Sequence, residues 1–406
     1  ALPLATAQPK PPPSRVAIAP DNVLLVNGRP VFPIGFTFGP PPGALSPRGV
    51  EGLRELREAG ALFLRTGPTG SGAWSDAYLP REREWMDAAA RNGMFTMPWL
   101  KELAAVRDRT SPVAEKLRRV VRLLKDHPGL GVWKGEDEPE WGKKPVPPLR
   151  TAYEIIHELD PDHPVWIVQA PRGTVASLKL YNDTYDIGGI DVYPVSYPPG
   201  VHSNESNKEI SMVGDFSRRI ADVVEGKKPF WMTLQIAFSG TVKPGKTLRF
   251  PTYPEQRFMA YQAVINGARG LVYFGGQLPA TLNERDAKLG WNWTYWDRVL
   301  RPVIEELGDR SPLAPALTAP ASSLPVRLES ASPGVEYTVR EAGKDLYLLA
   351  CKREGGTLQA RVTGLPAGIT RGEVMFEAPR QVTVTGGAFT DWFGPFEVHV
   401  YRFPRP

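Results

Sequence analysis

Short apolar runs alternate with amphipathic segments over the first three quarters of the chain. Eight runs rich in β-branched and aromatic residues end in glycine, proline or polar residues, as buried strands do. They fall at residues 31–38, 61–66, 94–99, 131–138, 165–169, 187–193, 230–235 and 270–274. Helical patterns lie between them at residues 49–59, 81–92, 113–125, 149–159, 216–224, 255–266 and 296–307.

This alternation predicts an α/β fold of the (β/α)8 TIM-barrel type. Parallel strands that are buried on both faces read as continuous apolar runs, and eight strand–helix units over roughly 280 residues match such a barrel. A doubly wound open sheet is the alternative. It is disfavoured because no predicted strand is followed by a glycine-rich phosphate loop.

The pattern changes after residues 311–325, which are rich in proline, alanine and serine. Beyond this segment apolar residues recur with a period of two in short runs separated by glycine, which predicts a small C-terminal antiparallel β-sandwich. We therefore expect a flexible Pro-rich tail at residues 1–15, a catalytic barrel at 16–312 and a β-sandwich at 322–406.

Composition narrows the classes of partner. The 49 Lys and Arg are interspersed with 44 Asp and Glu, so no basic footprint for nucleic acid is expected. The single cysteine, Cys351, excludes an internal disulfide framework, and the five histidines lack metal-ligand spacing. No apolar run reaches the roughly 20 residues of a membrane-spanning helix. We expect no cofactor, no metal, no nucleic acid and no membrane partner; the oligomeric state stays open.

The first residues of the sequence carry a signal for the cellular location of the protein. Ala5-Thr6-Ala7 is similar to the small-x-small pattern at the end of a secretory signal, and prolines follow it. We predict a secreted or periplasmic protein, with a plain disordered terminus as the alternative.

The fourth predicted strand carries the clearest chemical signal. Its apolar start, with Trp133, runs directly into Glu136, Asp137 and Glu138 and stops at Pro139. Three carboxylates at a buried strand end repel one another and lose solvation, a cost that is typical of functional sites. Barrel enzymes place their active sites at these strand ends.

The other strand ends supply aromatic, amide and charged side chains. Flat rings stack on sugars, while amides, guanidinium groups and carboxylates bind hydroxyls, so a carbohydrate substrate is favoured. Besides the catalytic candidates Glu138, Asp137 and Asp191, we expect substrate contacts from Arg65, Trp99, Gln169, Tyr193, Gln235 and Tyr273.

Asp137-Glu138-Pro139 resembles the Asn-Glu-Pro motif of clan-A glycoside hydrolases, which are (β/α)8 enzymes. The segments at residues 24–36, 251–257 and 267–270 are also similar to such proteins. The resemblance implies that Glu138 is the general acid/base. Two positions depart from it: Gln235 stands where the family has its nucleophilic glutamate, and Asp137 stands in place of asparagine.

Three mechanisms remain open for a hydrolase. Glu138 and Asp191 could act as an inverting pair, Asp137 could orient a substrate acetamide that attacks in place of the enzyme, or another carboxylate such as Glu136 could be the nucleophile. A non-catalytic carbohydrate-binding protein on a degenerate barrel is the alternative function. A polysaccharide lyase is a third option.

Overall fold

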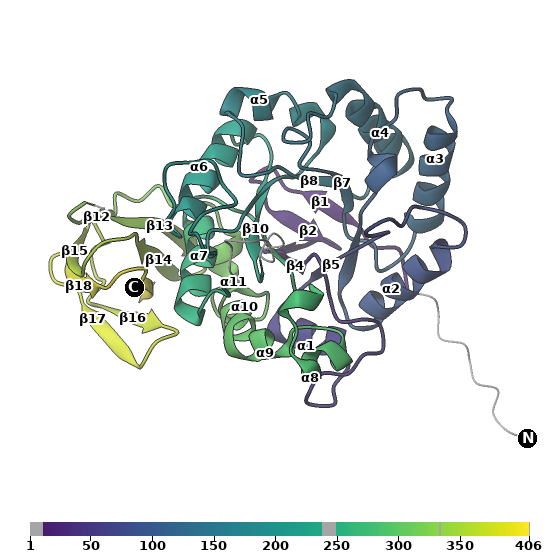
Figure 1. Cartoon of the computed structure of the whole chain (residues 1–406). Helices are drawn as coiled ribbons and strands as arrows, with labels where there is room; N and C mark the ends of the chain where they lie inside the picture. The colour runs from purple at the N-terminus through teal and green to yellow at the C-terminus, as the bar shows by residue number, and fades with distance from the viewer. Residues whose placement is uncertain (1–10, 238–248, 333, 406) are drawn as a thin grey trace, which may run out of the picture.

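The computed structural model describes residues 11–237, 249–332 and 334–405 (Figure 1). Ala5-Thr6-Ala7, on which the predicted location depends, lies outside these residues. Ser14 belongs to the predicted flexible tail but is buried, and its hydroxyl donates a hydrogen bond to Leu130 O at 2.6 Å. The tail prediction is therefore corrected at its inner end, where the chain is already packed.

In the described residues, eight parallel strands alternate with helices in the predicted order. They are β4 (Ile34–Phe36), β5 (Phe63–Thr66), β6 (Phe95–Pro98), β7 (Trp133–Asp137), β8 (Val165–Val168), β9 (Gly188–Val192), β10 (Phe230–Gln235) and β11 (Leu271–Phe274). Each lies within or close to one of the eight apolar runs, so that part of the fold prediction is confirmed.

The parallel strands pair in two sheets joined by bridges. One sheet has the order β6-β5-β4-β11-β10-β9, and β7 pairs with β8. Parallel bridges link β6 to β7 at Thr96–Leu130 and Trp99–Lys134, and β8 to β9 at Trp166–Ile187 and Gln169–Ile190. Each of the eight strands therefore has a parallel neighbour on both sides.

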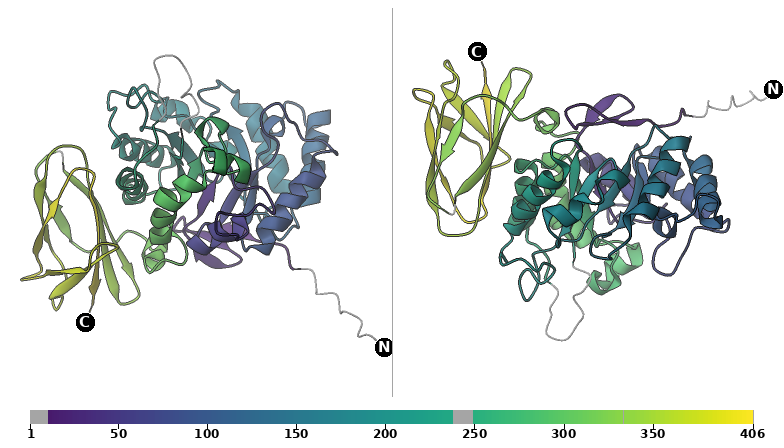
Figure 2. Two further views of the ribbon diagram at one scale, coloured as in Figure 1. Left: turned by 60° about the horizontal axis from the view of Figure 1, so that its bottom comes forward. Right: turned by 90° about the horizontal axis from the view of Figure 1, so that it is seen from above.

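Amphipathic helices cover the outer face of these strands (Figures 1 and 2). The main ones are α1 (Gly52–Ala59), α2 (Leu79–Arg91), α3 (Pro112–Leu124), α4 (Val146–Leu159), α6 (Met212–Val224), α7 (Tyr253–Ile265) and α10 (Arg301–Leu307). Shorter ones are α5 (Val175–Lys179), α8 (Glu284–Leu289), α9 (Trp293–Tyr295) and α11 (Ala314–Thr318), a π-helical turn at Trp296–Leu300, and 3-10 turns at Lys101–Ala104, Asn182–Thr184 and Pro279–Thr281. Local signals fix their starts: at α7, Thr252 and Glu255 form a reciprocal capping box.

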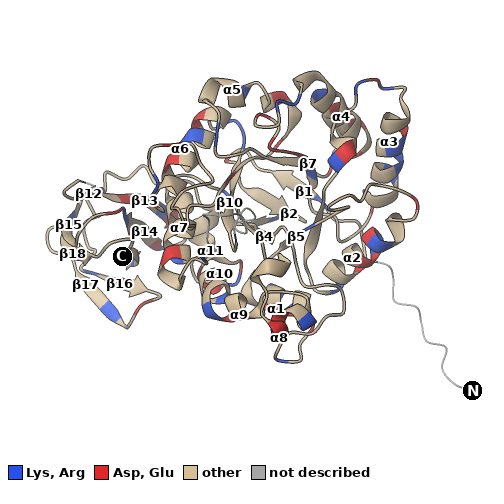
Figure 3. Cartoon of the chain, viewed as in Figure 1, with Lys and Arg blue, Asp and Glu red and all other residues tan. Residues whose placement is uncertain are grey.

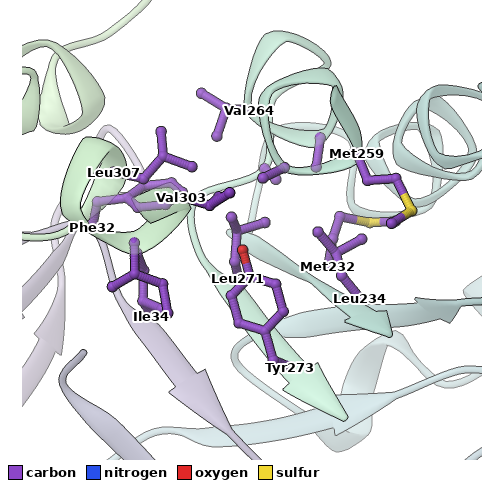
Figure 4. Packing of buried hydrophobic residues seen from close by; sticks show 14 of the residues in the cluster. Phe32, Ile34, Met232, Leu234, Met259, Val264, Leu271, Tyr273, Val303 and Leu307 are labelled. Carbon is purple, nitrogen blue, oxygen red and sulfur yellow. The ribbon is translucent and has the colours of Figure 1, made fainter. Parts of the chain in front are cut away.

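Alternate residues of each strand enter different cores, as the two-residue period of a strand requires. Inward-facing residues form one cluster, with members Phe63, Met97, Val132, Trp166, Trp231 and Val272. The hairpin of β1 (Val16–Ile18), β2 (Leu24–Val26) and β3 (Arg29–Val31) packs on this cluster. Outward-facing residues pack against the helices (Figure 4), among them Ile34, Met232, Leu271 and Tyr273.

The C-terminal part forms two antiparallel sheets that share a hydrophobic core, beside the helices α6 and α7 (Figure 2). One contains β12 (Arg327–Glu329), β15 (Leu358–Thr363) and β18 (Phe389–Phe393). The other contains β13 (Val335–Ala342), β14 (Asp345–Lys352), β19 (Val398–Pro404), β16 (Arg371–Met375) and β17 (Arg380–Thr383).

Strand β14 ties the two parts of the molecule together. Leu346 and Leu348 point into the core between the C-terminal sheets, whereas Leu349 and Cys351 belong to the large cluster beneath the helices. A polar junction adds to this apolar contact, because Glu336 accepts hydrogen bonds from Arg353, Arg218, Gln262 and Asn266 at 2.8 to 3.0 Å. The C-terminal sheets are thus part of one packed unit with the parallel strands.

The surface carries both signs of charge. Figure 3 shows basic and acidic residues interspersed along the helices, in keeping with the mixed distribution in the sequence. No helix among the described residues combines the length and apolarity needed to cross a membrane.

Candidate active site

The site lies at the C-terminal ends of the parallel strands, which we call the mouth. Strand β7 reaches it through an irregularity, since its register with β8 shifts between Lys134 and Asp137. Glu138 then adopts a left-handed backbone conformation with φ of 47°, and its N–H donates to Val168 O at 2.7 Å. Such a conformation is uncommon for a residue with a side chain and is often found at functional sites. It lets adjacent residues break the strict alternation of a strand.

Glu138 and Asp191 lie in direct contact at the mouth. Their carboxyl groups are joined by a hydrogen bond, and one oxygen of each lies within 4.8 Å of the other and of a ring nitrogen of His202. Asp191, on β9, is 6% exposed, whereas Glu138 is partly exposed. The more accessible of the two carboxyl groups is therefore Glu138.

Burial and mutual repulsion favour protonation of this pair. The pKa of Asp191 is raised well above its usual range by burial and then by the charges of Glu138 and Asp137. The pKa of Glu138 is also raised, by burial and then by Asp137. Because the two groups are coupled, the pair as a whole retains a proton to higher pH than an isolated carboxyl group would.

The pKa of Asp137 is shifted in the opposite direction from those of Glu138 and Asp191. Burial acts to raise its pKa, but the charges of Lys134 and Arg65 outweigh burial, and the pKa is lowered. The Lys134 ammonium, itself 1% exposed, lies 3.0 Å from the Asp137 carboxylate. The mouth therefore combines two carboxyl groups whose pKa values are raised with a third, Asp137, whose pKa is lowered. A division of this kind is typical of acid–base sites.

Aromatic rings surround these acids. The guanidinium carbon of Arg65 lies 4.8 Å from the ring centroid of Phe38 and 5.0 Å from that of Trp99. Phe274 stacks on Tyr193 at 5.3 Å, and Tyr193 stacks on His202 at 4.5 Å. We call these six residues the aromatic band. The band supplies flat apolar faces next to polar groups, which suits the alternating C–H and hydroxyl surfaces of a sugar.

Three buried polar atoms at the mouth lack a hydrogen-bond partner within the described residues. They are Trp99 Nε1, Gln169 Nε2 and Asp191 Oδ1. Buried polar groups in native proteins are almost always paired, so an unpaired group calls for an explanation such as a ligand or a bound water. Two donors and one acceptor near an acid pair match the hydroxyl groups of a carbohydrate.

Of the nine predicted site residues, the structure brings seven to the mouth: Glu138, Asp137, Asp191, Arg65, Trp99, Gln169 and Tyr193. Gln169 lies at the end of β8, where its side-chain oxygen accepts a hydrogen bond from Glu140 N at 3.2 Å. Its amide nitrogen is the group left for a ligand.

Two predicted substrate contacts are corrected. Gln235 is 0% exposed, and its amide is bonded at both ends to the backbone of Val195, each bond at 2.7 Å. It therefore braces the segment after β9. Tyr273 is also fully buried and faces outward from β11 into the helix layer, where it packs near Phe36 (Figure 4). The period of the strand directs its ring away from the mouth.

Besides Phe38 and Phe274 of the aromatic band, three residues outside the predicted set contribute to the site. Lys134 is a buried lysine between the apolar start of β7 and the carboxylates at its end, and a charged residue at this position of a buried strand is a signal that the sequence offers. His202 and Arg172 come from the segments after β9 and β8, and their sequence context does not distinguish them. The pKa of His202 is lowered to about 3 by burial and then by Arg172, so its imidazole is neutral.

The same groups have the donor types of a cation site. Glu138, Asp191 and the neutral His202 could together offer two oxygen atoms and one nitrogen atom to a divalent ion. The histidine spacing in the sequence gave no sign of such a group, because the three residues meet only through the fold.

Comparisons with known proteins bear on the fold. No protein-family profile matches the sequence, and no curated protein sequence matches it. Among solved structures, a glycoside hydrolase of family 5 from Bacteroides vulgatus aligns over 96% of this chain and 92% of its own, with 13% identity and a TM-score of 0.63.

Other solved structures with this fold act on different glycans according to their descriptions. An endoxylanase of family 30 from Clostridium papyrosolvens covers 92% of this chain and 96% of its own, with 12% identity and a TM-score of 0.53. An α-amylase from Anoxybacillus covers 92% and 98%, with 11% identity and a TM-score of 0.56. The chain shares the TIM-barrel-like fold of glycoside hydrolases, and the predicted resemblance is confirmed at the level of the fold.

Proposed function

We propose that the protein is a glycoside hydrolase that cleaves a poly- or oligosaccharide, with Glu138 as the general acid. The observation that carries this proposal is the contact between the Glu138 and Asp191 carboxyl groups, whose pKa values are raised, beside Asp137, whose pKa is lowered. The fold shared with glycoside hydrolases and the unpaired polar atoms of the mouth add support.

The proton moves from Glu138 to the glycosidic oxygen. As the bond between that oxygen and the anomeric carbon breaks, the bonding electrons go to the oxygen, and the leaving sugar departs neutral. A nucleophile, the substrate acetamide in the substrate-assisted case, bonds to the anomeric carbon; water then displaces it and returns a proton to Glu138. Asp191 is the more buried of the two, and its contact with Glu138 lets the pair retain a proton to higher pH than an isolated carboxyl group would. Asp191 is thus a positioning residue for the acid, and general acid catalysis of this kind contributes about 10²- to 10⁴-fold in rate.

Asp137 acts on the other partner of the breaking bond. Its negative charge, held by Lys134 and Arg65, stabilises the positive charge that develops at the sugar ring or orients a substrate acetamide for attack. Substrate assistance agrees with the position of Gln235, because it needs no enzyme nucleophile on β10.

The spacing of the acids disfavours an inverting pair. Inversion needs room for a water, with carboxyl groups roughly 6.5–9.5 Å apart. Oxygens of Glu138 and Asp191 lie within 4.8 Å of each other and share a hydrogen bond, so no water fits between them. A retaining mechanism with another carboxylate as nucleophile ranks second. Glu136 is the nearest candidate in sequence, but one of its oxygens already accepts a hydrogen bond from the N–H of Asp137.

The architecture that supports this site is, in our proposal, a closed (β/α)8 barrel at residues 16–312 and a β-sandwich at residues 322–406. Parallel neighbours on both sides of each strand support closure. The core shared by the two C-terminal sheets supports a sandwich. Secretion remains a proposal that follows from the first residues of the sequence.

One observation favours a different function. Gln235 occupies the strand position of the family nucleophile and is bonded to the backbone. A carbohydrate-binding protein without catalysis would retain the aromatic band and lose the need for a nucleophile. Binding of glycans without bond cleavage would identify this alternative.

The test is a glycan screen with matched variants. We expect wild-type protein to release reducing ends from at least one class of neutral, amino or acidic glycan, and Glu138→Gln to abolish release without changing the melting temperature. Glu140→Gln, which alters a partly exposed carboxylate two residues away, is the control and should keep activity. Undiminished release by Glu138→Gln would refute the proposal.

A further inference from the structure

An exposed tryptophan with an arginine against its ring lies next to the acid pair. Trp141 is 55% exposed, although large aromatic side chains are usually covered. The guanidinium carbon of Arg172 lies 4.4 Å from the centroid of its ring. A cation over an aromatic face is a favourable contact that fixes the orientation of both groups. The two residues together form one preorganised surface.

The backbone holds Trp141 close to Glu138. Gly142 N donates to Glu138 O at 2.8 Å, and Lys144 N donates to Pro139 O at 2.9 Å, so the segment after β7 is a tight turn. The hydroxyl of Tyr181 bonds Pro139 O and Lys144 O at 3.2 and 2.9 Å. Trp141 is therefore presented on a turn that is fixed at both ends.

Arg172 connects this surface to the acid pair. Its Nη2 donates to His202 O at 3.0 Å, and the ring of His202 lies within 4.8 Å of Glu138 and Asp191 oxygens. Gln169, three residues earlier, bonds Glu140 N and so joins the turn of Trp141 to the segment that carries Arg172. The surface and the acids belong to one rigid arrangement.

Among the described residues, no acidic group pairs with Arg172. In the described parts of the chain no carboxylate lies within ion-pair distance of Arg172, and its one hydrogen bond there is to His202 O. Other arginines of the chain differ in this respect: Arg219 pairs with Glu205 at 2.8 Å and Arg150 with Asp183 at 3.0 Å. A partly buried guanidinium with free N–H groups is suited to bidentate binding of a carboxylate.

We propose that Trp141 and Arg172 form a subsite for a negatively charged sugar, a uronate, on the leaving-group side of the scissile bond. The open face of Trp141 stacks on the sugar ring, and the free N–H groups of Arg172 bind its carboxylate. Trp141 lies on the turn that follows the acid and has no ring contact with the aromatic band among the described residues, so its sugar lies beyond the oxygen that Glu138 protonates. This subsite rests on the proposed function.

The subsite also explains a conflict in the electrostatics. The charge of Arg172 acts to lower the pKa of Glu138, which opposes the protonation that a general acid needs. A bound uronate would neutralise Arg172 and remove that effect. The correct substrate would thus strengthen the acid form of Glu138 as it binds.

Binding measured in the Glu138→Gln background tests the subsite separately from cleavage. The probes are oligogalacturonates, oligomannuronates and glucuronate-substituted xylo-oligosaccharides, each compared by calorimetry with a neutral counterpart of equal length. We expect one acidic class to bind at least tenfold more tightly than its neutral counterpart. Adding Arg172→Gln should remove this preference, and adding Trp141→Ala should weaken binding at least tenfold.

Two control variants replace an arginine and a tryptophan far from the proposed subsite in sequence. Arg361→Gln removes an exposed arginine on β15, and Trp392→Ala removes a tryptophan of similar exposure, so both should leave binding unchanged. Neutral glycans that bind as tightly as acidic ones, or a preference that survives Arg172→Gln, would overturn the subsite. Selective binding of an acidic glycan that depends on Arg172 would support the subsite whether or not the wild-type protein cleaves that glycan, whereas hydrolysis is refuted only by the separate glycan screen with Glu138→Gln.

Discussion

The carboxyl group of Glu138, which directly follows β7, is hydrogen-bonded to that of Asp191 on β9. Two carboxyl groups in such contact cannot both ionise easily, because like charges at this distance repel and both groups are partly desolvated. The contact therefore raises the pKa at which the pair loses its last proton, at the point where the sequence resemblance expects an acid. It also distinguishes the accessible donor, Glu138, from the buried Asp191.

Replacing Asp191 by Asn should shift the pH dependence of catalysis. The pair loses its last proton at a raised pKa, so activity is expected to fall as pH rises through that value. Without the second carboxyl group, Glu138 loses its proton at lower pH, and the alkaline limb of kcat/KM should move toward acid. Profiles of wild-type and Asp191→Asn protein measured on one substrate check this; superimposable limbs would show that Asp191 does not act on the acid.

Gln235→Glu introduces the residue that the clan-A resemblance implies at this position and is expected not to create a better hydrolase. The amide nitrogen of Gln235 donates to Val195 O, and a carboxylate there would face a carbonyl oxygen in a fully buried place. The loss of one buried hydrogen bond costs about 1 to 3 kcal/mol, and more if the new group stays charged. Thermal unfolding and turnover measure the two effects. A variant with unchanged stability and higher turnover would contradict the structural role of Gln235.

The arrangement of strands could be predicted from the sequence to within a few residues, because buried parallel strands are continuous apolar runs. The strand ends followed from it, and Glu138 and Asp191 with them. Strand β12 and the short helix α5 were not predicted, since segments of three and five residues carry little periodicity.

The finer features of the site depend on the fold. The shifted register of β7 and the left-handed backbone at Glu138 cannot be predicted from the residue types. They nevertheless determine that the adjacent residues Asp137 and Glu138 both lie at the mouth. Tyr273 was assigned to the mouth from its position at a strand end, although the two-residue period places it on the opposite face. The bonds between Gln235 and Val195 span 40 residues of chain and arise only from the tertiary structure.

Glu82 is expected to make stability depend on pH near neutrality. Burial raises its pKa from 4.5 to about 7, although Thr66, Gly67 and Tyr78 donate hydrogen bonds to it. Because the folded-state pKa lies above the unfolded value, its stabilising contribution is complete below pH 4.5 and is lost as pH rises through 7, by up to roughly 3 kcal/mol. Glu82→Gln should flatten the fall in melting temperature between pH 5 and 8.

The matched control for that experiment is Glu84→Gln, an exposed carboxylate on the same helix. This variant should keep the wild-type slope. Equal slopes for all three proteins would contradict the role of Glu82.

Glu336 should stabilise the junction between the two parts of the molecule. Burial acts to raise its pKa, but hydrogen bonds from Arg353, Asn266 and Arg218 outweigh it and lower the pKa. Its contribution is therefore present at neutral pH and lost on acidification below the unfolded pKa. Glu336→Gln should lower the melting temperature by several degrees at pH 7 and by much less at pH 3. An equal difference at both pH values would show that its charge is not what matters.

The central claim, that Glu138 donates a proton to the leaving oxygen, is tested most directly by leaving-group dependence. A general acid matters most when the leaving group is a poor one, so Glu138→Gln should lose about 10²- to 10⁴-fold in kcat/KM on a glycan with a sugar leaving group. On the matching dinitrophenyl glycoside, whose phenolate leaves without protonation, the variant should stay within a few-fold of wild type. An equal loss on both substrates would contradict the assignment of Glu138 as the acid.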